Sequence, residues 1–256
     1  MPPNVLNYRW PVVAAITALT AAGAWAHIGP SVDDNNRYLK LTPLGDRVRL
    51  AYTVVYGENP GRIARRSIDT NRDGAIGSDE AQAFANQLAA DVGRAVDVTV
   101  DGTQQPIYWA QIIPGMGTPV VDAGSFSVDL IAWLCLPSVG GPHQLQLRDQ
   151  FRVPHPGETE VRVEDSPGVT IERAHVGRDD MSEHIYKFLG PAGALTDDGL
   201  DLAFTAGDRA PVMADGACAQ ATARGPSRAT IVLAIVLGTG LTVAAALVLL
   251  RRRRNP

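Results

Sequence analysis

The sequence lacks most of the motifs that mark enzymes and metal centres. Its 256 residues include only two cysteines, Cys135 and Cys218, too far apart for a Cys-x-x-Cys zinc or redox motif. It has no His-Glu-x-x-His sequence, no phosphate-binding glycine loop and no Gly-x-Ser-x-Gly elbow. These absences disfavour zinc proteases, nucleotide-binding enzymes and α/β-hydrolases, and they leave a hydrolase of unknown type as an alternative that no motif supports.

Basic residues are scarce outside the two ends of the chain. Residues 27–228 contain all 27 acidic residues but only 18 of the 23 basic ones, which gives this region a net charge near −9. A surface of this charge repels nucleic acid and attracts divalent cations. We therefore expect no nucleic-acid partner.

The N-terminal segment has the composition of an export signal. Arg9 precedes an apolar run, residues 11–26, which is short for a bilayer span but typical of a signal h-region. Residues 24–26 read Ala-Trp-Ala and fit the small-x-small cleavage rule. The sequence therefore predicts a signal peptide over residues 1–26, whose removal makes His27 the new N-terminus. An uncleaved N-terminal anchor is the alternative.

The C-terminal segment has the composition of a membrane anchor. Residues 229–250 contain no charged residue and, as a helix rising about 1.5 Å per residue, are long enough to cross the hydrocarbon core. Four arginines follow at 251–254 and favour a cytoplasmic position for this end. The sequence predicts a single-pass protein of the cell membrane, with its N-terminus outside and a tail, residues 251–256, inside. The alternative is a bacterial sorting tail that a membrane protease removes after export.

Short alternating strands dominate the region between these ends. In residues 47–56 apolar and polar side chains alternate, which indicates a strand with one buried face. Turns rich in glycine and proline separate it from similar segments, a pattern typical of a β-sandwich. We predict a mainly β, sandwich-like ectodomain over residues 27–207 and a mobile stalk over 208–228, rich in Ala, Gly, Pro and Ser. Further strands are expected at residues 37–42, 95–100, 105–113, 125–136, 143–152, 160–164, 169–174 and 200–205.

Residues 58–95 lack this alternation and are rich in alanine. Pro60 would lie in the first turn of a short helix that ends at Ile68, and Ser78 would cap a second helix over residues 79–92. We expect this helix-loop-helix unit to be inserted in the sandwich.

The segment between these helices, residues 69–80, matches the EF-hand calcium loop position by position. In such a loop, side-chain oxygens converge from positions 1, 3 and 5, and a glycine at position 6 allows a sharp turn. Position 7 contributes its backbone carbonyl, and a glutamate at position 12 contributes two oxygens. The predicted metal ligands are Asp69, Asn71, Asp73, Ala75 and Glu80.

Ca²⁺ is therefore the predicted cofactor, because three carboxylates in one small loop repel one another without a cation. Gly77, at position 9, has no side-chain oxygen, so a water is expected to bind there. The sequence has no second loop of this type, which favours a structural ion with a Kd of about 10⁻⁴ to 10⁻³ M. Arg62, Arg65 and Arg66 in the first helix would form a solvated face or weaken binding by repulsion. A metal-free acidic turn is the alternative.

The hand and its surroundings resemble a group of bacterial exported proteins. The export signal, the histidine at the mature N-terminus, the early strands and the hand after Tyr-Gly-Glu-Asn-Pro are similar to periplasmic components and ectodomains associated with nickel/cobalt transport proteins. This resemblance, over residues 27–102, implies an accessory role in nickel, cobalt or copper uptake. His27 would then chelate a metal through its amine and ring nitrogen. A second histidine would complete that site, from among His143, His155, His175 and His184.

The predicted function is that of a calcium-binding, membrane-anchored extracytoplasmic protein, not an enzyme, with a structural or binding role at the cell envelope. Its expected partners are the membrane and a protein of the envelope. Cys135 and Cys218 are candidates for a disulfide, because an exported domain folds in an oxidising compartment. Two unpaired thiols, one buried and one exposed, are the alternative.

Overall fold

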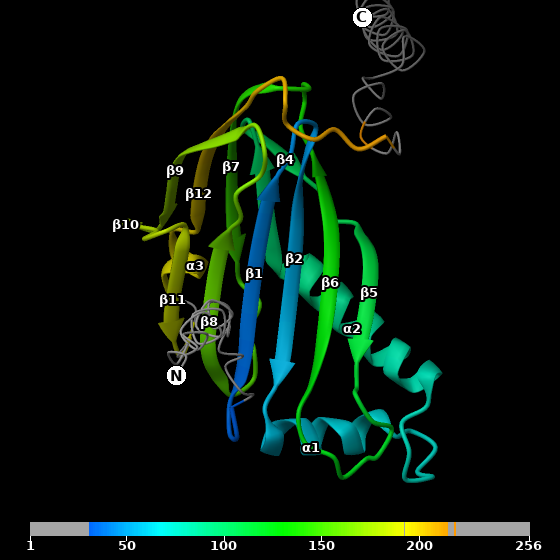
Figure 1. The fold of residues 1–256 in the computed structure, drawn as a ribbon. Helices are drawn as coiled ribbons and strands as arrows, with labels where there is room; N and C mark the ends of the chain where they lie inside the picture. The colour runs from blue at the N-terminus through cyan, green and yellow to red at the C-terminus, as the bar shows by residue number, and fades with distance from the viewer. Residues whose placement is uncertain (1–30, 192, 215–217, 219–256) are drawn as a thin grey trace, which may run out of the picture.

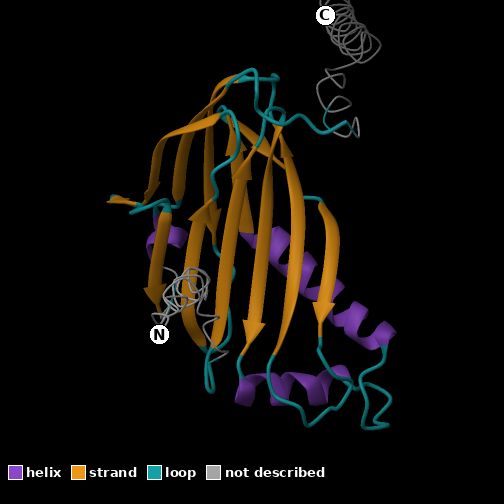
Figure 2. Cartoon of the chain, viewed as in Figure 1, coloured by secondary structure: helices purple, strands orange, loops and turns teal. Residues whose placement is uncertain are grey.

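Two packed β-sheets, with helices at one end and along one side, make up the described part of the chain (Figures 1 and 2). This is a computed structural model, in which residues 31–191, 193–214 and 218 are described. The predicted signal peptide, His27, and the predicted span and tail all lie outside these residues. Among the helices that are described, none is long and apolar enough to cross a membrane.

The first sheet has six strands in the order β11-β8-β1-β2-β6-β5. Its neighbours pair antiparallel, except that β1 runs parallel to β8. The alternation in β2 places Val48, Leu50, Tyr52 and Val54 on the buried face, as its sequence predicts. The strands of this sheet are β1 (Asn35–Pro43), β2 (Arg47–Tyr56), β5 (Trp109–Gly115), β6 (Phe126–Cys135), β8 (Pro156–Val163) and β11 (Ile185–Leu189).

The second sheet is antiparallel throughout, in the order β10-β9-β12-β7-β3-β4. Leu145 and Leu147 of β7, with Leu202 and Phe204 of β12, are fully buried in the core between the sheets. The predicted mainly β, two-sheet fold is therefore confirmed. The strands of this sheet are β3 (Val96–Val100), β4 (Thr103–Gln105), β7 (Gly141–Asp149), β9 (Val169–Val176), β10 (Asp179–Asp180) and β12 (Leu200–Ala206).

Two of the helices, α1 (Glu58–Ile68) and α2 (Ser78–Ala95), form the connection from β2 of the first sheet to β3 of the second. Helix α2 packs behind β5, where the indole nitrogen of Trp109 donates to the carbonyl of Ala89 at 2.8 Å. The expected helix-loop-helix unit is thus present, and it is the crossover between the two layers. A short helix, α3 (Gly193–Asp197), was not predicted.

The strand expected over residues 105–113 is in fact two strands in different sheets. Pro106 interrupts it, and because proline has no backbone N–H, the ladder of β4 stops there. The chain then crosses to the other layer and resumes as β5. Strands β10 and β11 were also not predicted, because their short, largely exposed segments show little alternation.

The segment after β12, residues 207–213, lies across one end of the sandwich, and we call it the strap. The N–H of Gly45, in the β1–β2 turn, donates to the carbonyl of Pro211 at 2.7 Å, and Ala210 is buried. Cys135, the last residue of β6, forms a disulfide with Cys218. The structure therefore differs from the predicted stalk over the strap. The strap approaches the turn closely because Gly45 has no side chain: a Cβ there would lie 2.9 Å from the carbonyl oxygen of Ala210.

The molecule consequently has two distinct ends. The strap pole holds the β1–β2 turn, the strap and the disulfide; the hand pole holds α1 and residues 69–80 (Figure 1).

Candidate metal centre

Residues 69–80 join the end of α1 to the start of α2 and follow directly from the capping of both helices. Asp69 ends α1, its N–H donating to the carbonyl of Arg65 at 3.1 Å. Gly77, with φ −72° and ψ 163°, is the residue that caps α2, one position before the predicted Ser78. Glu80, the third residue of α2, forms the reciprocal half of a capping box, because its Oε2 accepts the N–H of Gly77 at 3.0 Å.

The side-chain oxygens of the first half of the loop face its own backbone N–H groups. Asp69 accepts from the N–H of Asp73 at 3.2 Å and from that of Gly74 at 3.1 Å. Asn71 accepts from Asp73 at 2.9 Å, and Asp73 accepts from Ala75 at 2.9 Å. These bonds wrap the chain around the oxygens, and Gly74, at φ 86°, makes the left-handed turn that a side chain would strain.

Glu80 closes the loop from its other end. Its Oε1 accepts from the N–H and the hydroxyl of Thr70, both at 2.8 Å, and from the N–H of Asn71 at 3.2 Å. The N–H of Gly77, together with the hydroxyl of Thr70 and the N–H of Asn71, lowers the pKa of Glu80 to about 2. Glu80 is therefore a carboxylate at neutral pH and joins the two halves of the loop.

The donor set fits a hard divalent cation by residue type, since it offers carboxylate, amide and backbone carbonyl oxygens and no sulfur. Within the described ranges, no group of three or more His, Cys, Asp or Glu side chains is placed to hold a metal ion. In this loop the two oxygens of Glu80 accept hydrogen bonds from the N–H groups of Thr70, Asn71 and Gly77. An ion bound here would replace those hydrogen bonds with bonds to Glu80 oxygens, and Asn71 and Ala75 would supply the remaining protein ligands.

The connection between β5 and β6, residues 116–125, lies against the predicted calcium loop, and we call it the partner loop. Ala75 pairs with Val120 in an antiparallel β-bridge, and the N–H of Ile76 donates to the carbonyl of Pro119 at 2.7 Å. Ile76 is buried, as position 8 of such a loop requires. Residues 74–76 therefore share a short two-stranded contact with the segment that connects two strands of the first sheet.

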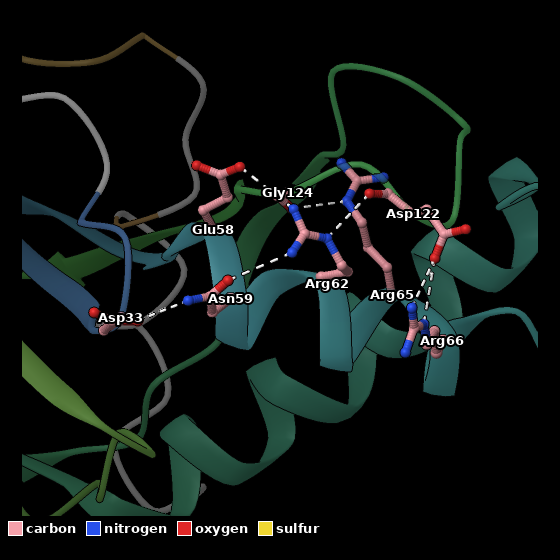
Figure 3. A network of polar contacts seen from close by, with 8 residues as sticks. All are labelled: Asp33, Glu58, Asn59, Arg62, Arg65, Arg66, Asp122 and Gly124. Carbon is pink, nitrogen blue, oxygen red and sulfur yellow. Dashed lines mark hydrogen bonds and ion pairs between the residues drawn. The ribbon is translucent and has the colours of Figure 1, made fainter.

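Arg65 fastens the partner loop to α1 (Figure 3). Its side chain is fully buried, and each of its five N–H groups has a backbone carbonyl acceptor, of which Figure 3 draws Gly124. The Nε donates to Gly124 at 3.1 Å, and the guanidinium lies 5.4 Å from the ring centre of Phe126. The other acceptors are Thr118 at 2.9 Å, Val120 at 3.2 Å, Ser125 at 3.5 Å, and Met116.

The neighbouring arginines act on the same segment from the surface. Arg66 pairs with the carboxylate of Asp122 at 3.0 Å, and Arg62 donates to the carbonyl of Asp122 at 3.3 Å (Figure 3). Burial lowers the pKa of Arg65. Among the described residues its acceptors are backbone carbonyls, which together with the Phe126 ring compensate for its lost hydration. The expectation of a solvated face is correct for Arg62 and Arg66 and wrong for Arg65, because the partner loop covers it.

The histidines considered for a second metal site do not gather in the described residues. His143 lies 2.8 Å from Asp101, while His175 and His184 pair with two other carboxylates. His27 lies outside the described residues. The partner loop, by contrast, was not identified from the sequence. The only sequence signal for it is a pair of valines, at 120 and 121, in a connection whose other residues are Met, Gly, Thr, Pro, Asp, Ala, Gly and Ser.

Comparison of the chain with models of known protein families finds no match, and comparison with curated proteins finds none either. The interpretation of residues 69–80 therefore rests on their residue types and geometry alone.

Proposed function

We propose that this protein binds one Ca²⁺ at residues 69–80 and is anchored outside the membrane by residues 229–250, with a structural or binding role at the cell envelope. The observation that carries the calcium assignment is the loop itself. Its residues match an EF-hand at positions 1, 3, 5, 7 and 12, and the side-chain oxygens of the first three accept from the loop's own N–H groups. The acidic balance of the exported region agrees with a cation ligand.

In this proposal the ion holds the connection between α1 and α2 in one conformation. The loop joins α1 to α2, those helices join the two sheets, and the β-bridge from Ala75 to Val120 ties the loop to the first sheet. Without a cation, the charges of Asp69, Asp73 and Glu80 repel one another in this loop. Binding would relieve that repulsion and hold the crossover and the partner loop as one rigid unit.

The test is a calcium titration of the full chain in zwitterionic lipid nanodiscs, by calorimetry and thermal melting. With a Kd of about 0.1–1 mM, 10 mM Ca²⁺ should stabilise the domain by about 1.4–2.7 kcal/mol. That corresponds to a rise in Tm of roughly 3–11 °C for a domain of this size. Glu80→Gln should abolish both binding and the Tm shift. Glu58→Gln, which changes an exposed glutamate of α1 outside the loop, should retain both.

A wild-type protein that neither binds Ca²⁺ nor changes its Tm contradicts the proposal. The same titration with Ni²⁺ and Cu²⁺, on wild type and His27→Ala, then decides whether the transition-metal role implied by the resemblance replaces it.

A further inference from the structure

The two ends of the described chain leave the sandwich at opposite poles. Ser31 lies at the hand pole, where its carbonyl accepts the N–H of Glu58 at 3.0 Å. Cys218 lies at the strap pole, fixed by its disulfide to Cys135. The ten residues of β2 run between these poles, a length of roughly 33 Å. A membrane attached through one end therefore meets a different face from a membrane attached through the other.

Three exposed apolar side chains lie at the strap pole, and we call them the apolar tip. Val139 is 69% exposed, Val212 55% and Met213 39%. The N–H of Gly140 donates to the carbonyl of Gly45 at 2.8 Å, which brings the β6–β7 turn against the β1–β2 turn. A Cβ on Gly45 would lie 3.0 Å from the Cγ2 of Val212, so the strap covers the same place. The tip is thus one surface built from two separate segments.

The chain length beyond the tip indicates what covers it. Ten residues separate Cys218 from the first residue of the predicted span, at position 229. Even fully extended, this segment reaches at most about 40 Å, and as a flexible coil its mean span is roughly 20 Å. Because the disulfide and the strap hold Cys218 to the sandwich, this limit applies to the folded domain and not just to its last residues.

We propose that the apolar tip rests on the surface of the bilayer in which the chain is anchored, so that the hand pole points away from the membrane. This inference rests on the membrane anchor of the proposed function. The contact needs little intrinsic affinity, because the short tether keeps the tip at a high effective concentration near the lipid. The strap carries one exposed acid, Asp208, and one exposed base, Arg209, so its charges cancel and the contact does not require anionic headgroups.

The test uses the full chain, with a protease site placed within residues 219–228, in phosphatidylcholine nanodiscs. Hydroxyl-radical footprinting is recorded on the same sample before and after cleavage, so that the domain folds before its release. Release should raise the labelling of Val139, Val212 and Met213 at least threefold. Labelling of Ile63 and Val120, which are exposed at the hand pole, should not change.

A matched pair of variants separates lipid contact from a general effect of release. Val139→Asp/Val212→Asp should make the labelling of Met213 equal before and after cleavage, whereas Ile63→Asp should leave the wild-type difference intact. The proposal is overturned if the labelling of Val139, Val212 and Met213 in the wild-type chain is the same before and after cleavage. Protection of both poles, which a retained N-terminal anchor would produce, also overturns it. Recovery of the uncleaved chain outside the membrane fraction refutes the anchor itself, a separate failure of the proposed function.

Discussion

Replacement of Arg65 by methionine should destabilise the domain far more than any other arginine-to-methionine change in α1. The substitution keeps a long apolar side chain beside Phe126 but removes all five donors to the partner loop. Five carbonyls then lose their hydrogen-bond donor, and each hydrogen bond from a charged donor stabilises the fold by about 1.5–3 kcal/mol. The partner loop can open so that water hydrates its carbonyls, and the desolvation cost of the buried guanidinium disappears. The net loss in the free energy of unfolding should therefore be about 3–5 kcal/mol.

The expected loss corresponds to a fall in Tm of roughly 6–20 °C for a domain of this size. Arg65→Lys, which keeps the charge but concentrates three donors at one atom, should lose about half as much free energy of unfolding as the methionine variant. Arg62→Met is the control. Arg62 lies on the same helix with a partly exposed side chain, a 3.4 Å ion pair and one 3.3 Å hydrogen bond to the partner loop at Asp122, so its loss should stay within about 1 kcal/mol.

Urea denaturation followed by tryptophan fluorescence measures these differences, and hydrogen exchange locates them. In Arg65→Met the amide of Val121, bonded to the carbonyl of Gly74, should exchange faster, because its loop is no longer held. If Arg65→Met and Arg62→Met lose the same stability, the partner loop does not depend on the buried guanidinium, and the reasoning fails.

Three further predictions concern other parts of the molecule. Cys135→Ser/Cys218→Ser should lower the free energy of unfolding by about 2–4 kcal/mol in urea, because the disulfide spans 83 residues; reduced wild type should match it. Burial alone would raise the pKa of Glu160, but donors led by Lys187 outweigh it and lower that pKa. Its carboxylate therefore contributes stability above about pH 4.5 that is lost as the pH falls, so urea midpoints of Glu160→Gln should depend less on acid than those of wild type. Gly77→Ser places a hydroxyl at position 9, where the nearest atom to a new Cβ is 3.7 Å away; calorimetry should show a several-fold tighter Ca²⁺ Kd than for Gly77→Ala.

The parts of the fold that follow from local sequence agree with the structure. The alternation of residues 47–56 fixes which face of β2 is buried, because its period matches the pleat. The limits of α1 and α2 follow from the acidic loop between them, and the first helix ends at Ile68 as predicted. The orientation of Asp69, Asn71 and Asp73 is likewise local, since their acceptors and donors lie within a few positions of one another.

The features that the sequence did not reveal depend on segments far apart in the chain. Arg65 has the pattern of a surface residue of a polar helix, and it is buried only because the β5–β6 pairing brings residues 116–125 over it. The strap has the composition of a flexible linker, and it is ordered by the β1–β2 turn, which precedes it by more than 160 positions. Neither contact leaves a periodic signal in the segment that makes it.

The position of the hand on the crossover between β2 and β3 has a consequence for the order of folding. Its oxygens come from twelve consecutive residues, whereas the first sheet must pair Asn35 with Pro156 across most of the domain. Local contacts form orders of magnitude faster than such distant pairings. If the proposed function is correct, a calcium ion would therefore bind a nearly complete loop while the sheets are still separate. Helices α1 and α2 would then be fixed relative to each other before the sheets form, and the two sheets would pack together afterwards.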